Sequence, residues 1–394
     1  MNPGPLSGVT VVSLEQAVAA PFATRQLADL GARVIKVERP GTGDFARHYD
    51  RTVHGLSSHF VWINRGKESL ALNLKSPEGK RILERLLAQA DAFVQNLAPG
   101  AVDRLGFSTK RLRTDYPRLI ICHISGYGSA GPYRDKKAYD LLIQAETGVL
   151  AVTGTEEHPA KTGIPVADIA GGMYAYSGIL AALLARQRSG EGTVLEVSLF
   201  TALAEWMGYP LYYTKYGGQA PPRAGASHAA IAPYGPFPTA DGPVLLGVQN
   251  EREWARFCQQ VLERPELVAD PRFQDNASRV AHREALHRII GQVFQELPRE
   301  EVVRRLDAAG IANAQMRRVQ ELAEHPQLRA LDRWRQVMTE AGPVEALLPP
   351  VSMAGWEPTL GPVPALGEQT DAILAELGYG PEEVAALRAS GAVG

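Results

Sequence analysis

The sequence is poor in cysteine. Only Cys122 and Cys258 occur in 394 residues, which is too few for a disulfide framework or a zinc site built on thiolates. We therefore expect buried apolar thiols, a reducing compartment and a cytoplasmic location. The nine histidines form no H-E-x-x-H motif, so no metal site is predicted.

An excess of positive charge is also missing. The chain has 41 Lys and Arg against 43 Asp and Glu, a formal net charge of -2 at pH 7. A general nucleic-acid binder is normally strongly basic, so we expect no nucleic-acid partner. An anionic ligand would need a local cluster of Lys and Arg.

Long apolar runs are absent as well. The longest candidate, residues 9–23, is interrupted by Glu15, Gln16 and Pro21 and has no basic segment before it. A membrane span needs roughly 18 apolar residues, so no membrane partner is expected. Hydrophobic residues nevertheless make up 45% of the chain, which indicates a globular protein with two or three domain-sized cores.

The first 40 residues predict a β-α-β unit. Residues 9–14 form an apolar, β-branched run, residues 21–30 carry apolar side chains at helical spacing, and Gly31 is a suitable helix C-cap. Residues 33–38 predict a second strand. A helical connection this short implies parallel neighbouring strands with a right-handed crossover.

The same pattern continues to about residue 200. Ser76, Pro77 and Glu78 predict a helix start, and further strands are expected at 91–94, 119–124 and 193–199. Residues 171–188 predict a long buried helix. The fold class is therefore α/β, an open, doubly wound, Rossmann-like parallel sheet in a large domain over residues 1–200.

The second half changes in character. We expect a linker at 201–225, a small α+β domain at 226–328 with a hairpin turn at Asp241-Gly242, and a proline-rich linker at 329–365. Residues 366–394 predict two short helices.

Candidate binding residues gather after the predicted strands. Gln16, Arg39 and Asn96 each follow a strand, and cations stand in nearby turns at Lys75, Arg104, Lys136 and Lys137. Open α/β sheets bind ligands beyond the carboxyl ends of their strands, and such cations would suit a phosphorylated cofactor. The alternative for each cation is an ordinary solvated side chain.

Asp168 is the most suggestive carboxylate. It lies at the entrance to the long helix, where the positive end of the helix dipole would favour its charged, nucleophilic form. A helix N-cap without any other role explains the local pattern equally well.

The chain resembles the class III CoA-transferases, the family of formyl-CoA:oxalate and carnitine CoA-transferases that also includes α-methylacyl-CoA racemase. The resemblance covers nearly the whole chain. It rests on ordered motifs at 28–40, Gly43-Asp44 and Arg47, 64–67, 72–79, Asn96, Pro99-Gly100, 104–106, 125–128, Asp168, 366–367 and 373–378.

The resemblance implies a nucleophile at Asp168 that forms an acyl anhydride and then an aspartyl-CoA thioester. It implies no permanently bound cofactor, with the coenzyme A thioester as a substrate. It also implies an interlocked homodimer, with residues 366–394 returning to the large domain. The CoA site carried over from the family consists of Gln16, Ala17, Arg39, Leu72, Lys75, Asn96, Leu97, Arg104 and Lys137.

One departure bears on the substrate. The glycine-rich loop of formyl-CoA transferases is not visible, and residues 225–235 instead resemble the branch that acts on C4–C5 dicarboxylates. We expect an acyl-CoA and a carboxylic acid as the small-molecule partners. Candidate substrate residues are Arg47, Tyr139, Asp140 and His228, with His48 and Arg223 as further cations.

Two alternatives to transfer stay open. An acyl-CoA racemase or epimerase abstracts an α-proton with a His-Asp pair, but here Tyr139 stands before Asp140 where that histidine would be. A non-catalytic CoA-binding homologue is the other alternative, and the presence of Asp168 argues against it.

Overall fold

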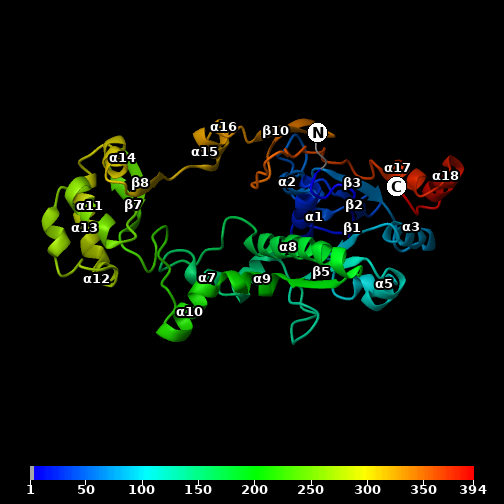
Figure 1. Cartoon of the computed structure of the whole chain (residues 1–394), viewed down its shortest axis with the longest axis horizontal. Helices are drawn as coiled ribbons and strands as arrows, with labels where there is room; N and C mark the ends of the chain where they lie inside the picture. Colours follow the sequence, from blue (N-terminus) through cyan, green and yellow to red (C-terminus); the bar gives the residue numbers. More distant parts are fainter. Residues whose placement is uncertain (1–3) are drawn as a thin grey trace. The chain divides into compact units, whose positions relative to one another are not determined.

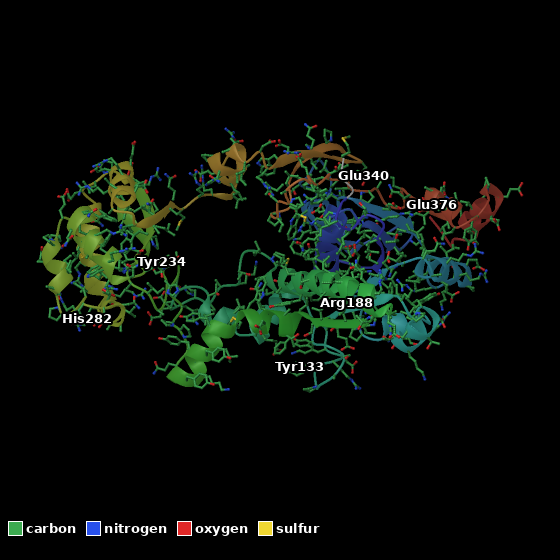
Figure 2. All side chains as sticks on the ribbon, in the orientation of Figure 1. Tyr133, Arg188, Tyr234, His282, Glu340 and Glu376 are labelled. Atoms are coloured by element: carbon green, nitrogen blue, oxygen red, sulfur yellow. The ribbon has the colours of Figure 1, made fainter. Side chains whose placement is uncertain are left out.

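The computed structural model describes residues 4–394, which form two compact units. The large unit contains residues 4–147, 162–207 and 331–394, and the small unit contains residues 148–161 and 208–330. In Figure 2, Tyr133 and Arg188 belong to the large unit, whereas Tyr234 and His282 belong to the small unit.

The large unit is built on a six-stranded parallel sheet in the order β3-β2-β1-β4-β5-β6. The predicted parallel α/β sheet is therefore confirmed. The direction of winding reverses between β1 and β4, which is where such sheets leave a crevice for a ligand. The strands are β1 (Thr10–Leu14), β2 (Arg33–Glu38), β3 (Lys67–Ala71), β4 (Ala92–Gln95), β5 (Ile120–Ser125) and β6 (Val194–Ser198).

Helices cover both faces of this sheet. Alternate strand residues such as Val12, Leu14 and Ile35 pack with the apolar sides of α3 (Pro77–Leu87), α5 (Thr109–Asp115), α17 (Thr370–Glu376) and α18 (Pro381–Ala389). The other face meets α1 (Ala19–Asp29) and α8 (Val166–Ser189), and Figure 1 shows α8 running alongside β5. Ser76 caps α3 by accepting a hydrogen bond from the Gly79 N–H, as expected.

Helix α8 lies very close to its neighbours because two of its residues are glycine. A Cβ at Gly172 would stand 2.7 Å from the Ala19 carbonyl oxygen, and one at Gly171 would stand 2.5 Å from Leu199 Cδ2. By length and composition α8 could cross a membrane. Its contacts with α1, α9 (Leu199–Trp206) and the sheet are those of a core helix.

The small unit carries an antiparallel sheet in the order β7-β8-β9. The predicted turn at Asp241-Gly242 joins β7 (Tyr234–Thr239) to β8 (Gly242–Gly247), and β9 (Ala312–Gln315) completes the sheet. A core containing Trp254, Phe257 and Phe294 packs under it. The helices are α7 (Val149–Val152), α10 (Gly208–Gly217), α11 (Glu251–Arg256), η2 (Phe257–Val261), η3 (Pro265–Ala269), α12 (Asn276–Ala281), α13 (Arg283–Phe294), α14 (Arg299–Ala308), α15 (Val319–Ala323) and α16 (Pro326–Ala330).

Several elements were not expected from the sequence. The segments described as linkers contain α9, α10 and an antiparallel hairpin of β10 (Trp334–Thr339) and β11 (Gly342–Leu347). Strand β3 was also missed, because its first residue is a buried lysine, Lys67, where a strand pattern would show an apolar side chain. The chain end joins this strand, since Val393 bridges to Leu72 and the Gly394 N–H donates to the Ala71 carbonyl at 3.1 Å.

The remaining elements of the large unit are short. They are η1 (Phe45–His48), α2 (Ser58–Asn64), α4 (Ala101–Arg104) and α6 (Asp140–Glu146).

Candidate functional site

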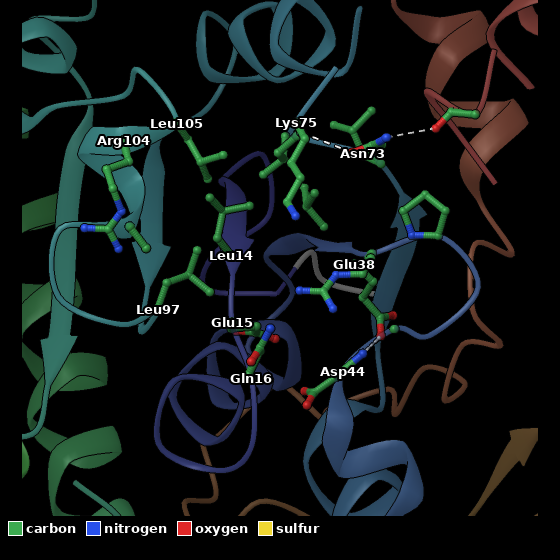
Figure 3. A pocket seen from close by; sticks show the side chains of 18 residues that line it. Leu14, Glu15, Gln16, Glu38, Asp44, Asn73, Lys75, Leu97, Arg104 and Leu105 are labelled. Atoms are coloured by element: carbon green, nitrogen blue, oxygen red, sulfur yellow. Dashed lines mark hydrogen bonds between the residues drawn. The ribbon is translucent and has the colours of Figure 1, made fainter. Parts of the chain in front are cut away.

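A cavity of about 670 Å³ lies beyond the carboxyl ends of the central strands of the large unit. Its wall includes the last residues of β1 and β2, Leu14 and Glu38, and the segments that follow β3 and β4. Figure 3 shows Lys75 and Arg104 on one side of it, and Gln16 and Asp44 on the other. The cavity lining brings together six predicted CoA-site residues: Gln16, Arg39, Leu72, Lys75, Leu97 and Arg104.

Three cations surround this cavity. Arg39, Lys75 and Arg104 are exposed at its rim, and no carboxylate among residues 4–394 forms an ion pair with any of them. The Arg104 guanidinium donates to the Pro99 carbonyl at 3.3 Å. Phosphate groups are suitable ligands for such uncompensated cations.

Asn96 and Ala17 do not line the cavity themselves but shape its edge. Asn96 Oδ1 accepts from the Gln16 N–H at 2.8 Å, and Asn96 Nδ2 donates to the Gln16 carbonyl at 2.8 Å. The backbone of Ala17 has a left-handed φ of 61°, and its N–H donates to Asp44 Oδ1 at 3.1 Å.

Lys137 and Tyr139 belong to a different stretch, the loop between β5 and α6. Both side chains are exposed, Tyr139 by 67%, and neither lines the cavity. The role of Lys137 in CoA binding and that of Tyr139 in substrate binding stay predictions.

Asp168 lies in the first turn of α8, but it does not cap the helix. Asp140 Oδ1 accepts hydrogen bonds from the N–H groups of Ala167 at 2.7 Å and Asp168 at 3.3 Å. Gln144 Nε2 donates to the other oxygen of Asp140 at 2.6 Å. The interpretation of Asp168 as a plain N-cap is therefore wrong, because Asp140 performs that role from α6.

The electrostatics of Asp168 also differ from expectation. Burial, with a smaller contribution from the negative charge of Asp140, raises the pKa of Asp168 to about 7. The helix terminus does not keep it fully charged, because Asp140 occupies the N–H groups that would stabilise the charge. Among residues 4–394 no side chain donates a hydrogen bond to Asp168, so its half-buried carboxylate is free to react.

Tyr49 was missed by the sequence analysis. Burial, together with the carboxylates of Asp44 and Asp168, raises the pKa of Tyr49 to about 12. Tyr49 is therefore close enough to both carboxylates to sense their charge, one at the cavity and one on α8. No sequence motif marks this tyrosine; only its position two residues after Arg47 could have drawn attention to it.

Arg47, a predicted substrate residue, lies outside the lining of the large cavity. Arg47 forms a bidentate pair with buried Glu38 at 2.9 and 2.7 Å, donates to the Pro364 carbonyl and stacks over Phe60. Its guanidinium is thus committed to the interior of the large unit.

His228 belongs to the small unit and lines a cavity of about 200 Å³ there, stacked on Tyr234. Its Nδ1 accepts from the Ala230 N–H at 3.1 Å, which leaves the proton on Nε2. A substrate contact by His228 stays a prediction. Within residues 4–394, no three His, Cys, Asp or Glu side chains group as metal ligands would.

Comparisons with known proteins agree with one another. Residues 6–370 match the family model described as CoA-transferase family III. An acetyl-CoA:oxalate CoA-transferase from Acetobacter aceti is 35% identical over 377 residues, covering 95% of this chain and 96% of that protein. The succinyl-CoA:glutarate CoA-transferase of Homo sapiens is 32% identical over 398 residues, covering 100% of this chain and 90% of that protein.

A solved structure has the same fold. A CAIB/BAIF family protein from Brucella suis superposes with a TM-score of 0.84 at 31% identity, covering 95% of this chain and 100% of that one. Nearly the whole chain therefore has counterparts in both sequence and structure.

Proposed function

This chain belongs to CoA-transferase family III, and we propose that it moves CoA from an acyl-CoA thioester to a free carboxylic acid with Asp168 as the nucleophile. The family resemblance drawn from the sequence motifs is thereby confirmed, as is the assignment as an enzyme. The observation that carries the proposed mechanism is the free, half-buried carboxylate of Asp168, whose capping role Asp140 has taken over.

In the first half of the proposed reaction, a carboxylate oxygen of Asp168 attacks the thioester carbonyl carbon. The C–S bond breaks, CoA leaves as the thiolate, and a mixed anhydride joins Asp168 to the donor acyl group. The thiolate then attacks the Asp168 carbonyl carbon, which releases the donor carboxylate and leaves an aspartyl-CoA thioester. Covalent catalysis of this kind divides one difficult step into easier ones.

In the second half, the acceptor carboxylate attacks the aspartyl-CoA thioester and expels the thiolate. The thiolate attacks the acceptor carbonyl of the new anhydride, which forms the product thioester and restores Asp168. No net proton, redox equivalent or permanent cofactor is consumed.

The cation-lined cavity supports the CoA part of the proposal. Arg39, Lys75 and Arg104 suit the phosphates of the nucleotide, and leucine side chains of the same cavity suit its adenine. Holding the nucleotide keeps the departed thiolate in place between the two attacks, and this remote binding energy can be used at the reacting carbon.

We propose a C4–C5 dicarboxylate as one of the acids. The human relative is named for succinyl-CoA and glutarate, a C4 and a C5 dicarboxylate, and residues 225–235 resemble the C4–C5 dicarboxylate branch. The relative from Acetobacter aceti is named for oxalate, a shorter dicarboxylate. Tyr139, Asp140 and His228 are the residues we carry forward for substrate binding. We leave Arg47 out, because Glu38 already neutralises it.

We also propose that the protein is a cytoplasmic homodimer. Both units expose large apolar side chains that a second copy would cover, including Leu142, Ile164 and Leu184 in the large unit and Tyr212 and Tyr216 in the small unit. Light scattering during size-exclusion chromatography should give the mass of two chains. The mass of one chain would contradict the dimer.

Trapping of the covalent intermediate tests the mechanism. Incubation with an acyl-CoA and hydroxylamine should convert Asp168 to a hydroxamate that peptide mass analysis locates. Asp168→Asn should give no hydroxamate, keep binding acyl-CoA and lose transfer by several orders of magnitude. The matched variant Asp140→Asn should still be labelled at Asp168. Near-normal transfer by Asp168→Asn would refute the nucleophile.

A further inference from the structure

Asp44 is a buried carboxylate on the cavity wall that the proposed chemistry does not use. Its Oδ2 accepts from Lys36 Nζ at 2.8 Å. Its Oδ1 accepts from two backbone N–H groups, those of Ala17 at 3.1 Å and Ala46 at 2.9 Å. One side chain therefore joins β2, the turn after β1 and the start of η1.

The turn that Asp44 holds is conformationally unfavourable. Ala17 has a φ of 61°, a region that residues with a Cβ rarely adopt, apart from asparagine and aspartate. Asn96 fixes the N–H and the carbonyl of Gln16, and Asp44 accepts from the N–H of Ala17 at the other end of the same peptide group. Without that bond, the turn would tend to relax toward a negative φ.

Asp44 is itself firmly anchored. The ammonium of Lys36 is fully buried between Asp44 Oδ2 and Glu15 Oε1, at 2.8 and 3.5 Å. Burial alone would lower the pKa of Lys36, but the carboxylates of Asp44 and Glu15 raise it, so the lysine stays charged. The Asp44 N–H also donates to Glu38 Oε1 at 2.9 Å. The carboxylate can therefore act as a rigid support for the turn.

We propose that Asp44 is a positioning residue that holds the Gln16–Ala17 turn in its left-handed conformation, so that the cavity is preformed for the acyl-CoA. The inference rests on the proposed CoA site. Asp44 also caps η1, the turn that leads to Tyr49. The same carboxylate thus holds both the Ala17 turn and the start of η1.

Asp44→Asn tests this role. The asparagine should turn its oxygen toward charged Lys36, which places its amide N–H₂ against the N–H groups of Ala17 and Ala46, donor against donor. We expect the acyl-CoA Kd to rise about tenfold, with a smaller change in kcat at saturating acyl-CoA. Ala17→Gly added to this variant should recover at least threefold of the lost affinity, because glycine adopts a positive φ without strain.

Asp29→Asn is the matched control. Asp29 is also a buried carboxylate, but it does not line the cavity. Its Oδ2 pairs with Arg25 Nη1 at 2.9 Å and with Arg65 Nη2 at 2.8 Å. This control should lower Tm and leave the acyl-CoA Kd unchanged. Wild-type affinity in Asp44→Asn, or no recovery on adding Ala17→Gly, would overturn the positioning role. Failure of the wild type to bind any acyl-CoA would instead overturn the proposed function.

Should Asp44→Asn not fold, two substitutions at Ala17 decide the question. Valine resists a positive φ, whereas asparagine is no smaller and tolerates it. Ala17→Val should therefore bind acyl-CoA at least threefold more weakly than Ala17→Asn. Equal Kd values for the two variants would show that the conformation of the turn does not matter, and would overturn the proposal.

Discussion

Asp140 accepts a hydrogen bond from the backbone N–H of Asp168 across 28 positions of sequence, at 3.3 Å. This contact places two carboxylates beside each other at the start of α8, one used as a cap and the other free. The second negative charge helps to raise the pKa of Asp168 toward neutrality. The pair therefore gives the proposed nucleophile a strong dependence on pH.

The activity should follow the ionisation of Asp168. Because attack needs the ionised carboxylate, kcat/KM for acyl-CoA should rise with pH and level off above about pH 7. Asp140→Asn keeps an oxygen for the helix N–H groups but removes the neighbouring charge, so the rise should shift to lower pH by about one unit or less. A pH–rate profile of both proteins measures this, and identical profiles would refute the coupling.

The free energy of unfolding should depend on the same ionisation of Asp168, but it should fall as the pH rises. The pKa of Asp168 is about 7 in the folded state against an ordinary value of 3.8, so the folded protein binds a proton that the unfolded chain releases between about pH 4 and 7. The contribution of Asp168 to stability is present below that window and is lost as the pH rises through it. Because asparagine does not ionise, Asp168→Asn should not show this loss of stability.

Thermal unfolding at pH 5 and pH 8 tests this. The difference in free energy of unfolding between Asp168→Asn and the wild type should favour the variant by about 1–2 kcal/mol more at pH 8 than at pH 5, after allowance for solvent screening. Asp103→Asn, at an exposed position of α4, is the control and should show the same difference at both pH values. A gain at pH 5 as large as that at pH 8 would contradict the raised pKa.

The cations of the cavity should determine CoA affinity. Arg39→Ala and Lys75→Ala should each weaken acyl-CoA binding roughly tenfold or more, because a charged hydrogen bond to phosphate is lost. Lys110→Ala, an exposed lysine that does not line the cavity, is the matched control. Calorimetric titration with CoA and dephospho-CoA would show which cation contacts the 3′-phosphate. Wild-type affinity in both cavity variants would place the CoA site elsewhere.

Proton exchange separates transfer from racemisation. A tyrosine such as Tyr139 is a poor replacement for the histidine base that abstracts an α-proton. A 2-methylacyl-CoA in deuterated water without an acceptor acid should therefore keep its α-hydrogen. Tyr139→Phe should leave this background unchanged and reduce transfer about tenfold or less, through loss of one neutral hydrogen bond. Rapid deuterium uptake with loss of chirality, detected by mass spectrometry, would favour the racemase.

Local patterns in the sequence were enough to predict a parallel sheet and five of its six strands, all except β3. Strand β2 and the Ser76 cap of α3 are set by neighbouring residues, and parallel strands bring their carboxyl ends to one edge whatever lies between them. For this reason Gln16, Arg39, Lys75 and Arg104 could be expected together from their positions, whereas Leu72 and Leu97 were expected only from the family resemblance.

Only the tertiary structure decided how the carboxylates share their roles. Asp140 reaches α8 from another helix, Asp44 reaches Ala17 from the start of η1, and Tyr49 lies near Asp168 without any motif. The pKa of a buried group and the stability of a left-handed backbone depend on which distant atoms come within a few ångströms. Spacing along the chain does not contain those distances, so the uncapped carboxylate of Asp168 and the contact of Asp44 with the Ala17 turn appear only once the chain is folded.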